Sequence, residues 1–238
     1  QLLNKWKGHL SNSQVLLADA TVYESYIRYP TDVKLLWESC QWLWERTIPE
    51  LCKRHRLKAP RSKYLEQKSK QLVYSKLRKK SHRKTKSRKR ALLHLAHKGI
   101  VALQGLLDQT KGGSLSVEAC GRFRTIRQVY RQQEHMYTYP GHKISGRIVS
   151  LAKPYVRPIV RGKENKPVEF GMKVHMNQVG GINIIEYASF TNFNESTRLR
   201  ISILKSKIRF GKCTHIAADR IYPTNKNRSF CTGQKITT

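Results

Sequence analysis

Two apolar runs lie near opposite ends of the chain, and each of them ends on an aspartate. Val15–Ala18 precedes Asp19, and His215–Ala218 precedes Asp219. A run of this kind followed by a carboxylate is typical of a buried strand that delivers one acid to the rim of a sheet. Two acids on neighbouring strands can hold a divalent metal ion. The pattern therefore predicts a fold in which these two strands are neighbours.

The rest of the chain is strongly basic. Its 238 residues include 47 Lys+Arg and 15 Asp+Glu, which gives a formal net charge of +32. Such an excess opposes a compact state through self-repulsion and normally implies a polyanionic partner. Nucleic acid is favoured over an anionic membrane, because no apolar run approaches the roughly 18–20 residues that span a bilayer and none resembles a signal peptide. Acids that hold metal in a cationic protein predict chemistry on a phosphate backbone.

Composition excludes several other classes of protein. Hydrophobic residues make up 39% of the chain, which is enough for a sizeable core and excludes a disordered basic tail. The five cysteines form no CxxC pair, which argues against a zinc ribbon or a disulfide framework and suits a reducing cytoplasm. We interpret all of them as structural or incidental thiols: Cys40, Cys52, Cys120, Cys213 and Cys231.

A first strand is predicted over about residues 14–22, and a large helical block follows it. Helical spacing of apolar residues begins after Asp32, which we interpret as a helix-start residue. Pro49 is expected to kink or interrupt this helix, with Thr47 and Glu50 at capping-box spacing. Further helices are expected over Ser62–Leu107, as one or two long helices, and, after a break at Gly112-Gly113, as another helix that continues to about Met136.

The chain after Gly146 has a different pattern. Residues 168–177 alternate between apolar and polar side chains, which is typical of a half-buried strand. Gly180-Gly181 predicts a tight turn into a returning strand over residues 182–190. The order is completed by a helix from Asn194 to Gly211, the strand that ends at Asp219 and a helix after Pro223-Thr224. Without the helical block the chain is β-β-β-α-β-α, a mixed α/β unit in which the first and fourth strands can lie side by side.

Five short stretches occur in order along most of the chain. They are Leu17-Ala18-Asp19-Ala20-Thr21, Arg28-Tyr29-Pro30-Thr31-Asp32, Arg157–Lys163, Lys166–Gly171 and Ala218-Asp219-Arg220-Ile221-Tyr222. Together they resemble bacterial insertion-sequence transposases of the DDE type, in the insertion-sequence-five-like group. The resemblance implies an α/β fold with an RNase H-like mixed sheet that is interrupted by a large basic helical insertion. The implied domains are residues 1–32 with the first strand, 33–145 as the insertion, and 146–238 as the remainder of the core.

The resemblance also implies catalytic residues. Asp19 matches the first catalytic aspartate of the family and Asp219 the second. The family's third acid is a glutamate on a downstream helix, in the pattern Tyr-x-x-Arg-x-x-x-Glu-x-x-x-x-x-x-Lys, which does not occur before Thr238. We therefore expect a fragment that lacks this acid and an N-terminal DNA-binding segment before Gln1, with little or no catalysis on its own.

The implied reaction is hydrolysis at an element end, followed by attack of the freed 3′-hydroxyl on target DNA. Both steps are in-line displacements at phosphorus, which two metal ions roughly 3.5–4 Å apart can assist. The implied cofactor is Mg²⁺, with Mn²⁺ as a substitute; Asp19 would bridge both ions and Asp219 would hold one. The implied partner is double-stranded DNA, both terminal repeats and target, bound by a homo-oligomer in the bacterial cytoplasm at the nucleoid and not at a membrane.

Two groups of basic residues are expected to contact DNA. The stretch Lys76–Arg90 contains no acid, so it lacks the i,i+4 pairs that usually support a solvated helical face. Basic residues near the predicted hairpin are expected to bind phosphate close to the scissile bond, with charge compensation of the acids as the alternative. The expected DNA-binding residues are Lys79, Lys80, Arg83, Lys84, Arg88, Lys89, Arg90, Arg157, Arg161, Lys163, Lys166 and Lys173.

Two other functions stay open at this point. A basic nucleic-acid-binding module without catalysis explains the charge, but gives no reason for acids at the ends of two apolar strands. An RNase H-like nuclease that cuts without joining would share the metal site and differ only in its products. A single strand-end aspartate is often a turn former or a helix cap, and it is the resemblance that favours catalysis for Asp19 and Asp219.

Overall fold

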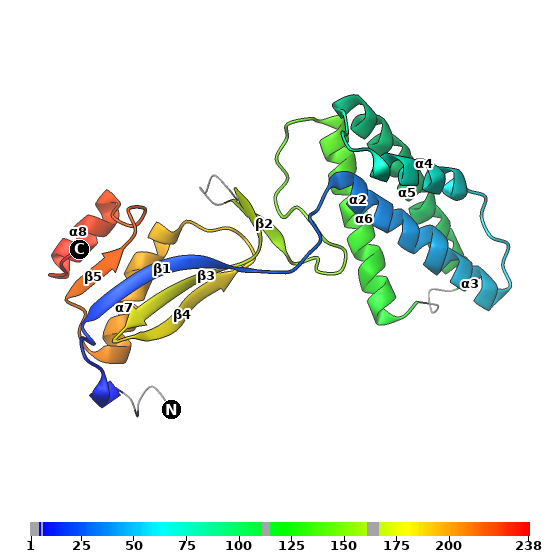
Figure 1. Ribbon diagram of the computed structural model, residues 1–238. Coiled ribbons are helices and arrows are strands. Elements are labelled where there is room, and N and C mark those ends of the chain that lie inside the picture. Colours follow the sequence, from blue (N-terminus) through cyan, green and yellow to red (C-terminus); the bar gives the residue numbers. More distant parts are fainter. Residues whose placement is uncertain (1–4, 6, 111–114, 161–166) are drawn as a thin grey trace. The chain divides into compact units, whose positions relative to one another are not determined.

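The computed structural model describes residues 5, 7–110, 115–160 and 167–238. The chain divides into two compact units. The first, here called the sheet unit, comprises Gln1–Tyr26 and Val156–Thr238, and the second, the helical unit, comprises Ile27–Tyr155. Each unit has its own cluster of buried hydrophobic residues. Figure 1 labels the elements of both units, which are described one at a time below.

Five strands form the sheet, and a short helix η1 (Lys7–His9) precedes them. The strands are β1 (Val15–Glu24), β2 (Arg157–Val160), β3 (Val168–Val179), β4 (Ile182–Ser189) and β5 (His215–Ala218). Their order is β2-β3-β1-β5, and β4 also pairs with β3. β1 is antiparallel to β3 and parallel to β5. The predicted mixed sheet, with the first and last strands side by side, is therefore confirmed.

β2 is a strand that the sequence analysis did not predict. It has four residues, contains Pro158 and lies at the end of the strand order, where the missing N–H of a proline is tolerated. Arg157 of β2 lies opposite Gly171 on one side of β3, and Glu24 of β1 lies opposite the same glycine on the other side. Gly171 therefore marks the point at which the chain leaves the sheet for the helical unit and the point at which it returns.

Glycine is required by the geometry at Gly171 and at the hairpin. A Cβ on Gly171 would lie 2.1 Å from the carbonyl oxygen of Tyr23, so only glycine permits β1 and β3 to pair there. Gly180 and Gly181 join β3 to β4 with φ of 55° and 82°. Two successive residues in the left-handed region are typical of the two-residue turn that fits the twist of a hairpin. The predicted turn is therefore confirmed.

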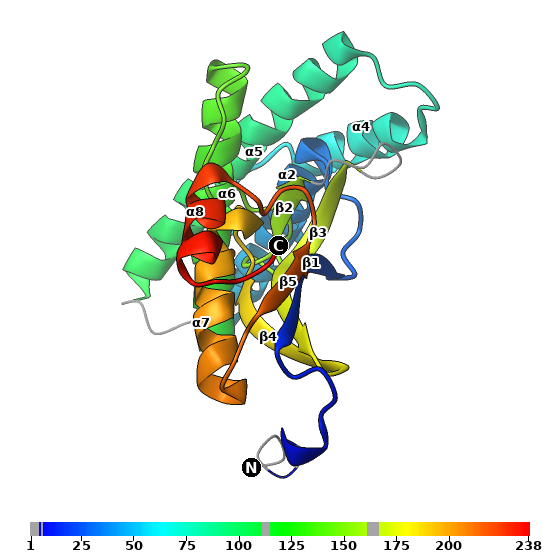
Figure 2. The same ribbon diagram turned by 90° about the vertical axis from the view of Figure 1, so that its left-hand side faces the viewer.

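Two helices pack on one face of the sheet. α7 (Leu199–Phe210) follows the short helix η3 (Glu195–Arg198), and α8 (Asn225–Gly233) follows β5. Asn194 and Thr224 cap the two segments with their side chains, and Gly211 ends α7 in the left-handed region, as predicted. Figure 2 shows both helices beside the sheet. Their shared core contains Leu16, Ala18, Val179, Leu199, Ile203, Cys213, Ile216, Tyr222, Cys231 and Ile236.

The β3 strand is present as predicted, but its polar side is the one that is buried. Alternation in a half-buried strand normally places apolar residues in the core. In β3, apart from Val174, the apolar residues between Val168 and Met176 are only half-buried, whereas Lys173 and His175 are 6% and 0% exposed. The reason is the charge of the covering segment, since Glu195, Arg198 and Lys205 supply partners for polar groups on this face. The side opposite α7 carries the apolar residues.

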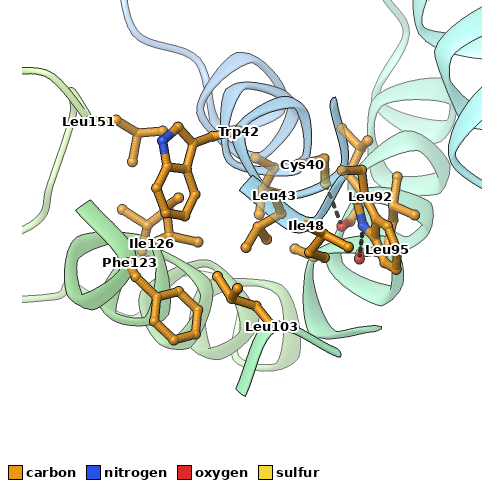
Figure 3. Packing of buried hydrophobic residues seen from close by; sticks show 14 of the residues in the cluster. Cys40, Trp42, Leu43, Ile48, Leu92, Leu95, Leu103, Phe123, Ile126 and Leu151 are labelled. Atoms are coloured by element: carbon orange, nitrogen blue, oxygen red, sulfur yellow. Dashed lines mark hydrogen bonds between the residues drawn. The ribbon is translucent and has the colours of Figure 1, made fainter. Parts of the chain in front are cut away.

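The helical unit contains the predicted block of helices. They are α2 (Asp32–Gln41), η2 (Trp42–Thr47), α3 (Ile48–His55), α4 (Tyr64–Lys76), α5 (His82–Gln109) and α6 (Val117–Thr138). Their core is almost entirely apolar and includes Trp42 and Trp44. Figure 3 shows this packing, in which the thiol of Cys40 donates to the Leu92 carbonyl oxygen at 3.6 Å and the indole of Trp44 to that of Leu95 at 3.1 Å.

The predicted interruption of the helix at Pro49 takes the form of a π-helical segment, but the cap that the spacing of Thr47 and Glu50 indicated does not form. The chain stays helical from α2 through η2 into α3, and Thr47 has helical dihedrals without a side-chain capping bond. η2 is a π-helical segment that ends at Thr47, two residues before the proline. A proline cannot donate a backbone bond and its ring clashes with the preceding turn, and the wider π turn relieves both problems. The helix therefore absorbs Pro49 instead of ending at it.

Asp32 extends the helical unit beyond its predicted limits of 33–145. Its Oδ1 accepts from Arg147 at 2.6 Å and from the side-chain amide of Gln133 at 3.0 Å, and its Oδ2 pairs with Lys89 at 2.9 Å. Asp32 begins α2, as predicted, with Thr31 as the cap. These bonds join α2 to α5, α6 and the segment after α6. Residues 27–32 and 146–155 consequently belong to this unit.

Candidate functional site

The two predicted acids lie next to one another in the sheet. The register of β1 and β5 runs from Val15 opposite His215 to Ala18 opposite Ala218, and the next residue on each strand is the aspartate. Asp19 lies within β1, whereas Asp219 directly follows β5. Parallel neighbours are about 4.8 Å apart, and partners in register point to the same face. The fold thus brings together two carboxylates that are distant in the sequence.

Asp19 lies on the accessible face of the sheet, opposite α7, and Asp219 is exposed at the end of β5 beside it. Ala18 and Ala20, which flank Asp19, are buried, while Asp19 and Asp219 are exposed. The row continues across the sheet from Asp19 to Met176 and then to Ile185, which is 62% exposed. One oxygen of Asp19 accepts from the N–H of Ala20 at 2.7 Å. An incoming ligand therefore has access to the acid pair.

A polar layer lies behind this pair, on the buried face. Glu186 of β4 is the residue that β4 inserts at the register shift between His175 and Met176 of β3. Its Oε1 pairs with Arg198 at 2.6 Å and with Lys205 at 2.9 Å, and Arg198 Nε donates to Oε2 at 3.0 Å. Burial raises the pKa of Glu186, but the hydrogen bonds and charges of Arg198 and Lys205 outweigh it, so the pKa lies below its usual range. Glu186 is an ionised anchor for η3 and α7.

His175 and Tyr222 occupy the same buried layer. Their rings are 5.8 Å apart between centroids, and they are 0% and 1% exposed. Burial lowers the pKa of His175 despite the charge of Glu186, whose Oε2 lies 3.4 Å from Nδ1. Burial also raises the pKa of Tyr222, and the charges of Glu195, Asp19, Asp219 and Glu186 add to the effect. Tyr222 thus stays protonated close to both acids.

Lys173 does not lie where a phosphate contact requires it. It was predicted to bind DNA, but its ammonium is buried, pairs with Glu195 at 2.7 Å and donates to the Phe193 carbonyl oxygen at 2.9 Å. Arg157 is half-buried, and burial lowers its pKa. Both side chains are engaged within the fold. Three further predicted contacts, Arg161, Lys163 and Lys166, lie outside the described residues.

The basic stretch of the helical unit falls across a helix junction. α4 ends at Lys76 and α5 begins at His82, so residues 77–81 connect two helices. Arg88 is buried and donates to Gln71 and Gln67, and Lys89 pairs with Asp32, so these two stabilise the fold. The other predicted contacts in this stretch are exposed, and we call them the basic cluster: Lys79, Lys80, Arg83, Lys84 and Arg90.

The basic cluster is electrostatically unfavourable in the protein alone. The first turn of α5 contains no acid, although acids normally occupy this position because the N-terminus of a helix is positive. Arg83 and Lys84 therefore add positive charge to the positive end of the longest helix. A phosphate backbone would relieve this repulsion through the side chains and the helix dipole together.

Sequence reasoning missed His175, Glu186 and Asn227 as residues of the polar layer. Alternation in β3 pointed to the opposite face, and no local pattern marks the inserted residue of β4. Tyr222 lay in a quoted motif but received no role. All five cysteines are free, as interpreted. Among the described residues, no group of three or more His, Cys, Asp or Glu side chains is placed to hold a metal ion.

Comparison with known proteins gives no relatives for this chain. No protein-family model matches it, and neither a curated protein nor a solved structure is similar to it at a significant level. Within the described part of the chain, no helix has the length and apolar character needed to cross a bilayer. Functional inference therefore depends on the site itself.

Proposed function

We propose that this chain is the RNase H-like catalytic core of a DDE transposase that cleaves and joins DNA. One observation carries the proposal: Asp19 and Asp219, each at the end of an apolar run, directly follow paired residues of the parallel strands β1 and β5. A basic nucleic-acid-binding module has no need for this arrangement. The charge of +32 and the exposed basic cluster support a polyanionic partner.

The donor set fits Mg²⁺. The ion prefers oxygen ligands, keeps several waters, and is usually bound by one or two carboxylates together with substrate phosphate. Asp19 and Asp219 would hold it, since both are exposed and each directly follows one residue of the last paired positions of β1 and β5. When bound, Mg²⁺ supplies electrophilic activation of the phosphate and a lower pKa for the attacking oxygen. The chain's own contribution is to fix the two carboxylates and to bind the DNA.

The two units would divide this work. The sheet unit presents the acid pair, and its polar layer keeps the strands and the covering helix in place. The helical unit offers the basic cluster, whose contacts to the DNA backbone would position the duplex without reading its sequence. Removing the acids should therefore leave DNA affinity intact.

Metal binding and strand transfer test the proposal separately. Titration of the chain with Mn²⁺, followed by electron paramagnetic resonance, should show binding that Asp19→Asn and Asp219→Asn each weaken at least tenfold. Both variants should bind a labelled duplex as tightly as the parent chain. Glu24→Gln, at the exposed end of the same strand, is the matched control.

The products distinguish the remaining alternatives. We expect little or no product from this chain, because it lacks the family's third acid. Joined duplexes on incubation with element-end DNA and Mg²⁺ would support a transposase, and nicked products without joining would indicate a nuclease. A parent chain whose Mn²⁺ binding is unchanged by both substitutions would contradict the metal site and favour a non-catalytic DNA-binding protein.

A further inference from the structure

A pair of buried rings connects the two acid-bearing segments from behind. His175 belongs to β3 and is the register partner of Ala20, the residue after Asp19. Tyr222 closes a turn on Asp219, since its backbone N–H donates to the Asp219 carbonyl oxygen at 2.9 Å. The rings meet at a centroid distance of 5.8 Å with a tilt of 48°. Their contact therefore links the backbone of one acid to the backbone of the other.

The two acids differ in how firmly the backbone holds them. Asp19 lies within a strand of ten residues that pairs with β3 on one side and with β5 on the other. Asp219 follows a strand of only four residues and begins a turn. No ladder bond extends from β1 to Asp219 in the described register, which ends at Ala18 and Ala218. The position of Asp219 therefore depends on how its turn is held.

Tyr222 is held at both its ring and its backbone. Its ring lies in the core beneath β1, together with Ala18 and Ile203. Its carbonyl oxygen accepts from the side-chain amide of Asn227 at 2.8 Å, and the same amide nitrogen donates to the Ser196 carbonyl oxygen at 2.8 Å. Asn227 is 5% exposed. The turn is thus tied to β3 through the ring and to η3 through Asn227.

The polar atoms of the two rings make this buried placement costly. The Nε2 of His175 and the hydroxyl of Tyr222 are buried without a hydrogen-bond partner among the described residues, and Nδ1 of His175 has only the Glu186 carboxylate at 3.4 Å, without a hydrogen bond. Leaving such atoms unpaired costs about 1–3 kcal/mol each. A leucine or phenylalanine pair would fill this core without that cost. A role beyond packing is the simplest reason to find a histidine against a tyrosine here.

We infer that Tyr222 and His175 are positioning residues that set the separation of Asp19 and Asp219, with Asn227 holding the turn on the other side. This inference rests on the proposed function for its metal readout. The contact acts through the backbone, so the ring matters more than the hydroxyl. Tyr222→Phe should therefore retain the Mn²⁺ affinity and the slow exchange of the turn, whereas Tyr222→Leu should lose both.

Two measurements test the inference on the full chain. Mn²⁺ affinity, taken well below the melting temperature of every variant, should fall about tenfold in Tyr222→Leu and stay within twofold in Tyr222→Phe. Hydrogen–deuterium exchange of peptides that cover residues 214–224 should be at least tenfold faster in Tyr222→Leu. His175→Leu should resemble Tyr222→Leu in the direction of both effects.

Ile203→Ala is the matched control, because Ile203 is fully buried in the same core but lies on α7 and belongs neither to β3 nor to the turn after Asp219. Like Tyr222→Leu, it should lower the melting temperature. It should not change the Mn²⁺ affinity, and residues 214–224 should exchange no faster relative to the rest of the sheet unit than they do in the parent. Equal behaviour of the two variants in both measurements would overturn the inference. The parent chain could show slower exchange at the turn than Tyr222→Leu and yet bind no Mn²⁺. That result would support the link between the two segments and contradict the proposed metal function.

Discussion

The helical unit and the sheet unit bury their residues by different rules. Most buried side chains of the helical unit are apolar and occur at the helical spacing seen in the sequence, although Gln71, Arg88 and Gln133 are buried there too. The sheet unit buries Glu186, Lys173 and His175 beneath the segment that contains η3 and α7, and leaves Met176 and Ile185 on the accessible face. Apolar residues at helical spacing identify the buried face of a helix directly. Alternation in a strand assigns its residues to the two faces of the sheet but does not say which face is buried. In this sheet the charged partners on η3 and α7 bury the polar face.

The largest expected effect tests the close approach of β1 and β3. Gly171→Ala should destabilise the sheet unit by more than about 3 kcal/mol, because the new Cβ would meet the Tyr23 carbonyl oxygen at 2.1 Å. Hydrogen exchange in β1 and β3 would report it. Fluorescence from Trp37, Trp42 and Trp44, which belong to the helical unit, should melt as in the parent.

Gly105→Ala in the helical unit should have the opposite effect on stability, because there is room for the new Cβ. Nothing lies within 4 Å of a Cβ at Gly105, which is inside α5. Alanine there should stabilise by about 0.5–1 kcal/mol through helix propensity and leave β1 and β3 unchanged. If either variant shifted the unfolding transitions of both units by the same amount, the two units would unfold together and could not be compared as separate units.

The polar core gives the next largest effect. Glu186→Gln should cost about 3 kcal/mol, because it leaves Arg198 and Lys205 beside an uncharged side chain in a buried layer. Chemical denaturation followed by exchange in the sheet unit would measure it. A loss below about 1 kcal/mol would mean that these charges are fully solvated and that the buried polar face is of little energetic consequence.

The single carboxylate that organises the helical unit gives a smaller, pH-dependent effect. Asp32→Asn should cost about 2 kcal/mol at neutral pH, because three donors lose a charged acceptor. Burial raises the pKa of Asp32, but Lys89, Arg147 and Gln133 outweigh it and hold the pKa below its usual range.

A lowered folded-state pKa fixes the direction of the pH dependence. The contribution of Asp32 is fully present above the unfolded pKa of about 3.9 and is lost as pH falls through the lower folded value. The free energies of unfolding of the parent and of Asp32→Asn, followed by tryptophan fluorescence, should therefore become equal only at a pH near or below the folded pKa of Asp32. Convergence already at pH 6 would contradict it.

The smallest effect on folding is expected at the basic cluster. Arg83→Ala combined with Lys84→Ala should change stability by less than about 0.5 kcal/mol, because both side chains are exposed. The slope of log affinity for duplex DNA against log salt should fall by about two. Lys70→Ala, at an exposed residue paired with Glu66, is the control and should leave the slope nearly unchanged. An unchanged slope in the double variant would place the DNA elsewhere.

Much of the fold follows from local chemistry in the sequence. The Gly180-Gly181 turn, the caps at Asn194 and Thr224 and the apolar runs before the two aspartates predicted the hairpin, both covering helices and the pairing of β1 with β5. Each of these signals is contained in a few consecutive residues. Their joint result, two aspartates side by side, needed only the topology that they imply.

The features that escaped prediction depend on distant partners. Lys173 resembles any exposed basic residue until Glu195 is placed beside it, and Asp32 resembles a helix start until Arg147 is known to reach it. Glu186 turns inward only because β4 inserts a residue against β3. The π-helical segment before Pro49 keeps the helix continuous, although the spacing of Thr47 and Glu50 is that of a capped helix start.

The position of Gly171 makes the chain modular. Glu24 and Arg157 flank this one glycine on either side of β3, so the sheet holds the two ends of the excursion about 10 Å apart, twice the strand spacing. Three or four extended residues span that gap. A linker of that length could replace residues 27–155 without moving a strand, and both aspartates would keep their places. The sheet unit can therefore accept inserted domains of different kinds at this point, and the positions of Asp19 and Asp219 do not depend on which domain is inserted.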